Sequence, residues 1–104
     1  MIDNLKPMLF ISRHLATEDQ DRIAGENGYF LVEVGDVNAF DSAAVYTFID
    51  ANPCAAICCV HPLIALIAYE RGRDVGVFEN ANRAPEGEKP SFEAVSLRIV
   101  RSQR

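Results

Sequence analysis

The stretch Pro53–Gly72, P-C-A-A-I-C-C-V-H-P-L-I-A-L-I-A-Y-E-R-G, decides the fold. Its first part, Cys54–Val60, is apolar throughout and does not alternate, which is typical of a strand covered on both faces. Its second part, Leu63–Tyr69, suits a helix, because Pro62 fits a first helical turn and Gly72 fits the position after a helix end. The stretch therefore predicts the strand–loop–helix joint of a parallel α/β sheet, with a histidine at the joint.

Length indicates a single domain spanning residues 1–104, and the order of its predicted elements makes it a Rossmann-like α/β domain. With 49% hydrophobic residues, a chain of 104 residues can bury a core without disulfides or metals. The net charge of −5 argues against a duplex nucleic acid partner, which normally needs a basic face. No apolar segment reaches the ~20 residues of a membrane span, and the N-terminus lacks a signal-peptide pattern. We therefore expect a cytoplasmic protein with no membrane partner.

Three cysteines, Cys54, Cys58 and Cys59, fall within the predicted strand. Cys54 and Cys58 would lie about 13 Å apart at ~3.3 Å per residue, and Cys58 and Cys59 would point to opposite faces, so no pair suits a disulfide. The spacing also matches no zinc motif. We therefore expect reduced thiols within the core, which fits a cytoplasmic protein.

Shorter patterns predict the remaining elements. Thr17 and Gln20 have the spacing of a capping box, and Asp41 is a second candidate cap, with Phe40 and Val45 placed as a hydrophobic staple. We expect strands at Met8–Ser12, Tyr29–Val34, Cys54–Val60, Asp74–Glu79 and Phe92–Val100, helices at Glu18–Ala24, Ser42–Ala51 and Leu63–Tyr69, and a polar loop at Asn80–Pro90.

The resulting element order is β-α-β-α-β-α-β-β, which is typical of a small Rossmann-like three-layer sandwich. Right-handed crossovers place the first strand beside the third. The connection between the last two strands holds no helix, so Phe92–Val100 is expected to be an antiparallel edge strand. We therefore predict four parallel strands, an antiparallel C-terminal edge strand and helices on both faces.

Polar residues follow the carboxyl end of each predicted parallel strand, where open α/β sheets bind their ligands. They are Ser12, Arg13 and His14 at the end of the first strand, Asp36 after the second, His61 after the third, and Asn80, Asn82 and Arg83 after the fourth. Both histidines of the chain belong to this set. We therefore predict a site at this sheet edge, with the two histidines as catalytic residues and the others as ligand-binding residues.

Each member of this set also has a purely structural interpretation. His61 can cap the helix that follows it, and His14 and Arg83 can be solvated surface residues. Asp36 and the two asparagines can shape turns through bonds to nearby backbone. Their convergence at one edge of the sheet favours a ligand site over these separate explanations.

Phosphate binding is the chemistry that suits the set. The helix after His61 offers free N–H groups and the positive end of its dipole, and Arg13 and Arg83 can bind phosphate oxygens in fork geometry. A histidine that titrates near neutrality can act as base, acid or nucleophile. The spacing of the histidines and carboxylates does not support a metal site, so we expect neither a metal nor another cofactor.

Several familiar motifs are absent. The sequence holds no G-x-x-x-x-G-K-[ST], no G-x-G-x-x-G and no G-x-S-x-G. A cysteine-phosphatase loop needs an arginine six residues after its cysteine, and after Cys59 that position holds Ala65. The lack of a complete catalytic motif keeps a non-enzymatic function open as an alternative.

Two short segments resemble the histidine phosphatase superfamily. Phe10–His14, F-I-S-R-H, is similar to that family's Arg-His-Gly box, with Leu15 in place of the glycine. Val60–Leu66, V-H-P-L-I-A-L, is similar to its second histidine, at a strand end before an apolar helix. The resemblance implies that His14 is a nucleophile that accepts phosphate, and that Arg13 and the second histidine hold the phosphate.

The Ser12-Arg13-His14 run also resembles the opening strand of small CRISPR-associated Rossmann-like proteins related to ring nucleases. This second resemblance implies a dimer that binds a cyclic oligoadenylate across its symmetry axis, and metal-independent cleavage of that ligand.

Two functional hypotheses follow. The first is a domain that binds a phosphate-bearing ligand, preferably a nucleotide, and acts as a metal-independent phosphohydrolase or phosphodiesterase through its histidines. The second is a non-enzymatic interaction module whose polar loop after the fourth strand contacts another protein. Under either hypothesis, the apolar helix Leu63–Tyr69 and the open edge strand predict a homodimer.

Overall fold

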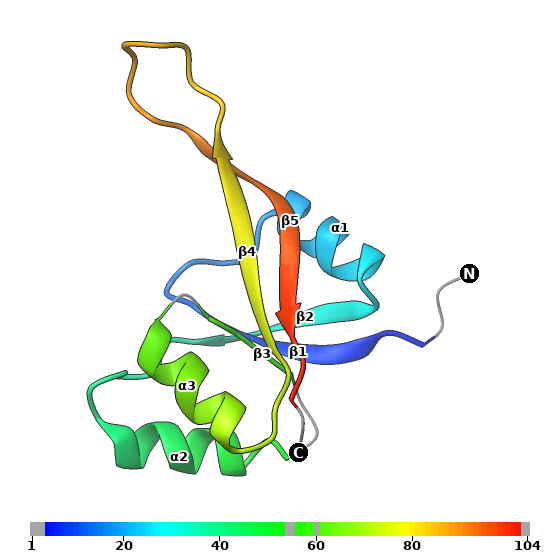
Figure 1. Ribbon diagram of the computed structural model, residues 1–104, viewed down its shortest axis with the longest axis vertical. Coiled ribbons are helices and arrows are strands. Elements are labelled where there is room, and N and C mark those ends of the chain that lie inside the picture. Colours follow the sequence, from blue (N-terminus) through cyan, green and yellow to red (C-terminus); the bar gives the residue numbers. More distant parts are fainter. Residues whose placement is uncertain (1–3, 54–55, 60, 103–104) are drawn as a thin grey trace.

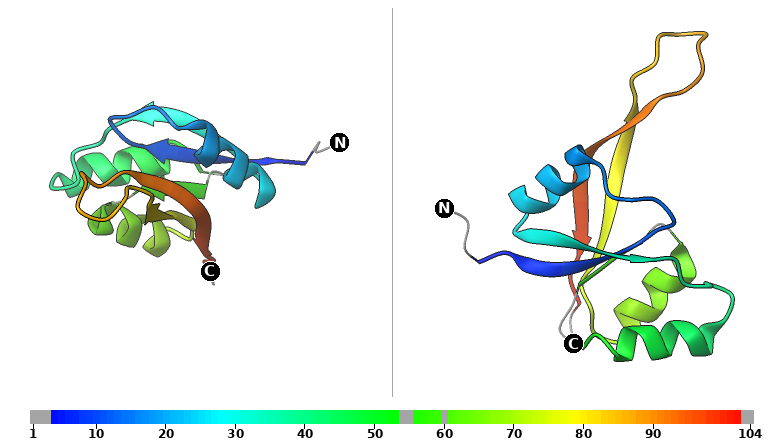
Figure 2. Two further views of the ribbon diagram at one scale, coloured as in Figure 1. Left: turned by 90° about the horizontal axis from the view of Figure 1, so that it is seen from above. Right: turned by 180° about the vertical axis from the view of Figure 1, so that it is seen from behind.

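A five-stranded mixed sheet forms the centre of the computed structural model, which describes residues 4–53, 56–59 and 61–102. The described part contains strands β1 (Lys6–Ile11), β2 (Tyr29–Gly35), β3 (Ala56–Cys59), β4 (Val75–Asn82) and β5 (Phe92–Val100), and helices α1 (Glu18–Glu26), α2 (Ser42–Asp50) and α3 (Pro62–Glu70). Helices α2 and α3 lie side by side, and α1 lies apart from them near β5 (Figures 1 and 2).

The strand order β2-β1-β3-β4-β5 confirms the predicted topology. The first four strands run parallel, and β5 pairs antiparallel with β4 at the edge of the sheet. Strand β1 lies between β2 and β3, so Met8 faces Leu31 on one side and Ala56 on the other. The chain leaves β1 toward one edge and β3 toward the other, so the strand order reverses between these two strands. This switch point is where open α/β sheets form a crevice.

Strand β3 is covered on both faces, as its unbroken apolar sequence predicts. Its four residues are between 0% and 8% exposed. Ile57 and Cys59 belong to the core beneath α2 and α3, while Ala56 and Cys58 belong to the core that contains residues of α1 and β5. Three residues of the predicted strand, Cys54, Ala55 and Val60, lie outside the described residues.

The fourth strand does not end at Glu79, as the sequence analysis expected, but continues to Asn82. Antiparallel pairing with β5 supplies partners for the backbone of residues 80–82, so this polar run is extended as part of a hairpin. A register shift between Glu79 and Asn80 marks a bulge in the ladder. Figure 1 shows the hairpin projecting well beyond the body of the molecule.

The first strand is also displaced from its expected position at Met8–Ser12. It begins at Lys6 and ends at Ile11, because its ladder with β2 starts at the pairing of Lys6 with Tyr29. Ser12 therefore follows the strand, and its backbone N–H donates to the carbonyl of Gly35 at 2.9 Å. This bond holds the ends of β1 and β2 together.

The helix ends are capped as the sequence predicts. The side chains of Thr17 and Gln20 form a reciprocal capping box at α1. At α2, the side chain of Asp41 accepts from the backbone N–H of Ala44. The hydrogen bonds that these caps supply matter because each helix has only nine residues. No helix within the described ranges is long and apolar enough to cross a membrane.

Gly76 gives a test of the packing between the sheet and α1. A Cβ atom at this position would lie 2.8 Å from Met8 Cε and 3.2 Å from Leu97 Cδ1. Met8 is 0% exposed, so its side chain cannot move out into solvent. We expect Gly76→Ala to lower the free energy of unfolding by about 1–3 kcal/mol, measured by urea denaturation.

Gly25 provides the matched control, because it lies in α1 and a Cβ there meets no atom within 4 Å. Gly25→Ala should leave the protein as stable as the wild type or slightly more stable, since alanine favours helix. Equal stability of Gly76→Ala and the wild type would show that Met8 repacks freely and would contradict the prediction.

Candidate functional site

A cavity of about 400 Å³ opens at the carboxyl ends of β1, β2 and β3. Five of the predicted site residues line it together with apolar core residues: Ser12, Arg13, His14, Asp36 and His61, with Ile11, Cys59 and Ile64 beneath them. The cavity therefore lies at the switch point of the sheet, where the segments after β1 and β3 diverge. The structure brings these five residues together as the sequence analysis expected.

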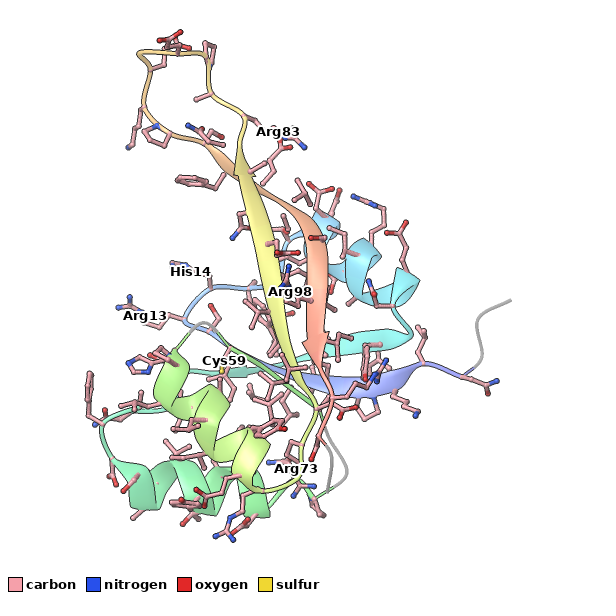
Figure 3. All side chains as sticks on the ribbon, viewed as in Figure 1. Arg13, His14, Cys59, Arg73, Arg83 and Arg98 are labelled. Atoms are coloured by element: carbon pink, nitrogen blue, oxygen red, sulfur yellow. The ribbon has the colours of Figure 1, made fainter. Side chains whose placement is uncertain are left out.

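The segment after β1 is held by its own hydrogen bonds. The Ser12 hydroxyl accepts from the backbone N–H of His14 at 3.0 Å, which closes a tight turn around Arg13. Four residues further on, the N–H of Ala16 donates to the Glu33 carboxylate on β2 at 3.0 Å. The side chains of Arg13 and His14 are exposed and point away from the sheet (Figure 3). A fixed backbone thus presents a cation and an imidazole at the cavity mouth.

Arg13 differs from the other arginines of the described chain, because its guanidinium forms no hydrogen bond or ion pair with a described residue. Its counterparts all have partners: Arg22, Arg71, Arg83, Arg98 and Arg101 pair with carboxylates, and Arg73 donates to the carbonyl of Ile49. The guanidinium of Arg13 is therefore available to an anion in the cavity without breaking an existing ion pair.

His61 does cap helix α3, as its structural interpretation predicted. Its Nδ1 atom accepts a hydrogen bond from the backbone N–H of Leu63 at 3.2 Å. Because Nδ1 acts as acceptor, the neutral ring carries its proton on Nε2, which can donate to a second group. His61 can therefore cap the helix through Nδ1 and bind a ligand through Nε2 at the same time.

Phe40 lies next to His61, which the sequence analysis did not predict. We expected this residue to form a hydrophobic staple with Val45, but its side chain is 82% exposed. Its ring meets the imidazole of His61 edge to face, with centroids 5.3 Å apart. From the sequence, an aromatic residue before a helix cap can pack on its own helix or against a neighbouring one. Only the approach of the N-termini of α2 and α3 shows that Phe40 contacts His61.

Asp36 follows β2 and places a carboxylate on the same cavity. It accepts the backbone N–H of Val37 at 3.0 Å, so it also shapes its own turn. A carboxylate repels a phosphate but accepts hydrogen bonds from sugar hydroxyls. Asp36 therefore suits a hydroxyl of a ligand better than its phosphate.

The cysteines of β3 are not nucleophiles at neutral pH. Burial raises the pKa of Cys58 to about 12, and the neighbouring Cys59 adds to the effect. Burial also raises the pKa of Cys59 to about 11, although a hydrogen bond with the backbone of His61 lowers it. Both thiols therefore stay protonated, and Cys59 forms part of the cavity floor.

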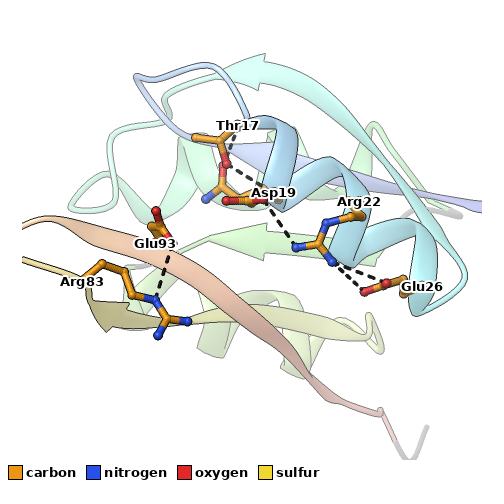
Figure 4. Close-up of polar contacts among 7 residues, drawn as sticks. Thr17, Asp19, Arg22, Glu26, Arg83 and Glu93 are labelled. Carbon is orange, nitrogen blue, oxygen red and sulfur yellow. Dashed lines mark hydrogen bonds and ion pairs between the residues drawn. The ribbon is translucent and has the colours of Figure 1, made fainter.

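The predicted residues of β4 separate into two groups. Asn80 lines a second cavity that adjoins the first, together with Phe78. Asn82 lies further along the hairpin, where its side-chain oxygen accepts from the N–H groups of Ala84 and Ser91. Arg83 pairs with Glu93 at 3.5 Å (Figure 4) and lies on the hairpin beyond the cavities (Figure 3). The continuation of β4 carries Asn82 and Arg83 away from the cavity.

A third cavity, of about 230 Å³, lies at the opposite end of the sheet and contains Tyr29, Arg73 and Asp74 in its wall. Its carboxylate already has partners, since Asp74 accepts from Arg101 at 3.2 Å and from the Ser102 N–H at 2.9 Å. These bonds fasten the end of β5 to the body. We therefore assign a structural role to this region.

Among residues 4–53, 56–59 and 61–102, no group of three His, Cys, Asp or Glu side chains is placed to hold a metal ion. No family model, curated protein or solved structure matches the chain.

The role of His61 as a helix cap can be tested by stability measurements, separately from any role in ligand binding. We expect His61→Ala to lower the free energy of unfolding by about 1 kcal/mol, because the helix cap is lost. His61→Asn should keep most of the stability, since asparagine is a good cap. Urea denaturation measures both variants, and equal destabilisation of the two would contradict the assignment of His61 as a cap.

Proposed function

We propose that the protein binds a phosphate-bearing ligand, preferably a nucleotide, in the cavity lined by Ser12, Arg13, His14, Asp36 and His61. The observation that carries the proposal is the guanidinium of Arg13, which has no partner among the described residues and lies at the mouth of a cavity of about 400 Å³. The cavity lies at the switch point of a parallel sheet, which is the usual ligand position in this class of fold.

Three donors support a phosphate at this position. Arg13 supplies a fork of charged N–H groups, and the Nε2–H of His61 supplies a second donor. The third is the N-terminus of α3, where Pro62 has no N–H and His61 already binds the N–H of Leu63, so the N–H of Ile64 is left. Ile64 lines the same cavity as Arg13 and His61, which supports its backbone N–H as the third donor to the phosphate.

We further propose that any turnover of this ligand uses His14. The imidazole of His14 forms no hydrogen bond with a described residue, whereas Nδ1 of His61 is engaged in the helix cap. His14 is thus the histidine that can accept or deliver a proton, or attack phosphorus, without disturbing the fold. The reaction would be hydrolysis of a phosphate monoester or diester.

The anion site is tested by comparing two arginine variants. We expect Arg13→Ala to weaken binding of inorganic phosphate, pyrophosphate or a nucleoside monophosphate by about tenfold or more, because a charged hydrogen bond is lost. Arg83→Ala is the matched control, because its guanidinium pairs with Glu93 outside the cavity. Isothermal titration calorimetry measures both. Equal affinities of the two variants, or no binding by any of these ligands, would overturn the proposal.

The projecting hairpin favours the second hypothesis, that of a protein-interaction module. Residues 85–93, which contain its tip, are all exposed, and the hairpin extends away from the sheet (Figure 1). Such a segment can contact another protein without obstructing the cavity. Both functions can therefore coexist in one molecule.

We also propose that the protein is a homodimer. Helix α3 exposes Leu63, Leu66 and Tyr69, of which Leu66 is 64% exposed. A row of exposed apolar side chains on one helix is typical of a surface that another protein covers.

The dimer is tested by sedimentation at tens of micromolar protein. We expect the wild type to sediment with the mass of a dimer and Leu66→Glu with the mass of a monomer, since a buried charge disfavours association. Thr47→Glu, which adds the same charge on exposed α2, should remain dimeric. A monomeric wild type would contradict the proposal.

A further inference from the structure

A second cavity, of about 190 Å³, adjoins the proposed anion site. The two cavities share the lining residues Ile11, Ser12, His14 and Cys59, so they lie on either side of the segment that follows β1. The first cavity opens toward α3, and the second opens toward α1 and β4. A ligand whose charged end lies beside Arg13 could therefore extend past Ser12 into the second cavity.

The walls of the second cavity are chiefly aromatic and aliphatic. Phe10 and Phe78 meet edge to face with ring centroids 6.4 Å apart, and Leu15, which is 78% exposed, lies at the mouth. An apolar cavity of about 150 Å³ can accept a benzene ring, so the volume here is sufficient for a flat heterocycle. Aromatic side chains favour such a ring through stacked or edge-to-face contacts.

The polar rim of this cavity contains one amide that is available to a ligand. The Oε1 of Gln20 and the hydroxyl of Thr17 are already engaged in the capping box of α1. Asn80, by contrast, forms no side-chain hydrogen bond with a described residue. It lies two residues after Phe78 on β4, so strand alternation places both side chains on the face of the sheet that lines this cavity.

We propose that the second cavity binds the base of a purine nucleotide whose phosphate lies beside Arg13. This inference rests on the anion site proposed above and names the class of its ligand. An asparagine amide donates and accepts at once, and it matches the N6 amino group and N7 of adenine in a bidentate pair. Adenine is therefore the base that Asn80 recognises best, with the ring against Phe10 and Phe78.

The test compares adenosine 5′-monophosphate with ribose 5-phosphate, which carries the same phosphate and sugar without a base. We expect the wild type to bind the nucleotide about tenfold or more tightly than the sugar phosphate, as a bidentate base contact implies. Asn80→Ala should remove most of this preference and leave the affinity for ribose 5-phosphate unchanged. Isothermal titration calorimetry provides both affinities.

Controls separate the base site from the anion site. Asn4→Ala removes an exposed amide from the segment before β1 and should bind both probes as the wild type does. Arg13→Ala should weaken both probes by a similar factor, because it acts on the phosphate that they share. Uridine 5′-monophosphate should bind less tightly than the adenine nucleotide, because its base presents a different edge to Asn80.

The outcomes are distinguishable. If the wild type binds both probes equally, or if Asn80→Ala retains the preference, the base site is wrong and the anion site still stands. If uridine 5′-monophosphate binds as tightly as the adenine nucleotide, the assignment of adenine is wrong. If neither probe nor inorganic phosphate binds, the proposed function fails and the base site fails with it.

Discussion

The parallel pairing of β1 with β3 is the constraint on which the rest of this structure depends. Leu9 lies opposite Ile57 and Ile11 opposite Cys59, so the two most buried strands of the sheet share one ladder. Because both strands are covered by helices, the register between them is set by packing on two faces. Their chains then diverge to opposite sides of the sheet, and the cavity lies in the space between them.

The candidate site depends on the packing of the core, because the same segment contributes residues to both. Cys59 belongs to the apolar core and also forms the floor of both cavities. Two residues later, His61 caps α3 through its Nδ1 and lines the first cavity. The fold thereby fixes the orientation of the imidazole before any ligand binds, which reduces the entropy cost of binding.

The distribution of charge separates residues that hold the structure from residues that suit a ligand. Arg98 and Arg101 join β5 to Glu79 and Asp74, and Arg83 joins the two strands of the hairpin through Glu93. Exposed pairs of this kind contribute little to stability, but they neutralise the guanidinium groups. Arg13 has no such partner within the described chain, so the charge pattern supports the same cavity as the geometry does.

Local sequence determined much of this protein. The apolar run through Ile57, the capping box of Thr17 and the caps at Asp41 and His61 depend on neighbouring residues, and their structures agree with the predictions. The clustering of Ser12, Arg13, His14, Asp36 and His61 was also predictable, since the carboxyl ends of parallel strands meet at one sheet edge.

Tertiary structure alone decided how far β4 extends and what Phe40 contacts. Residues 80–82 contain two asparagines and are typical of a loop in sequence, but β5 offers a hydrogen-bond ladder that keeps them extended. That extension moves Asn82 and Arg83 away from the cavity and leaves Asn80 beside Phe78. The interactions that stabilise these arrangements are hydrogen bonds and contacts between segments far apart in the sequence. They cannot be predicted from the pattern within a single segment.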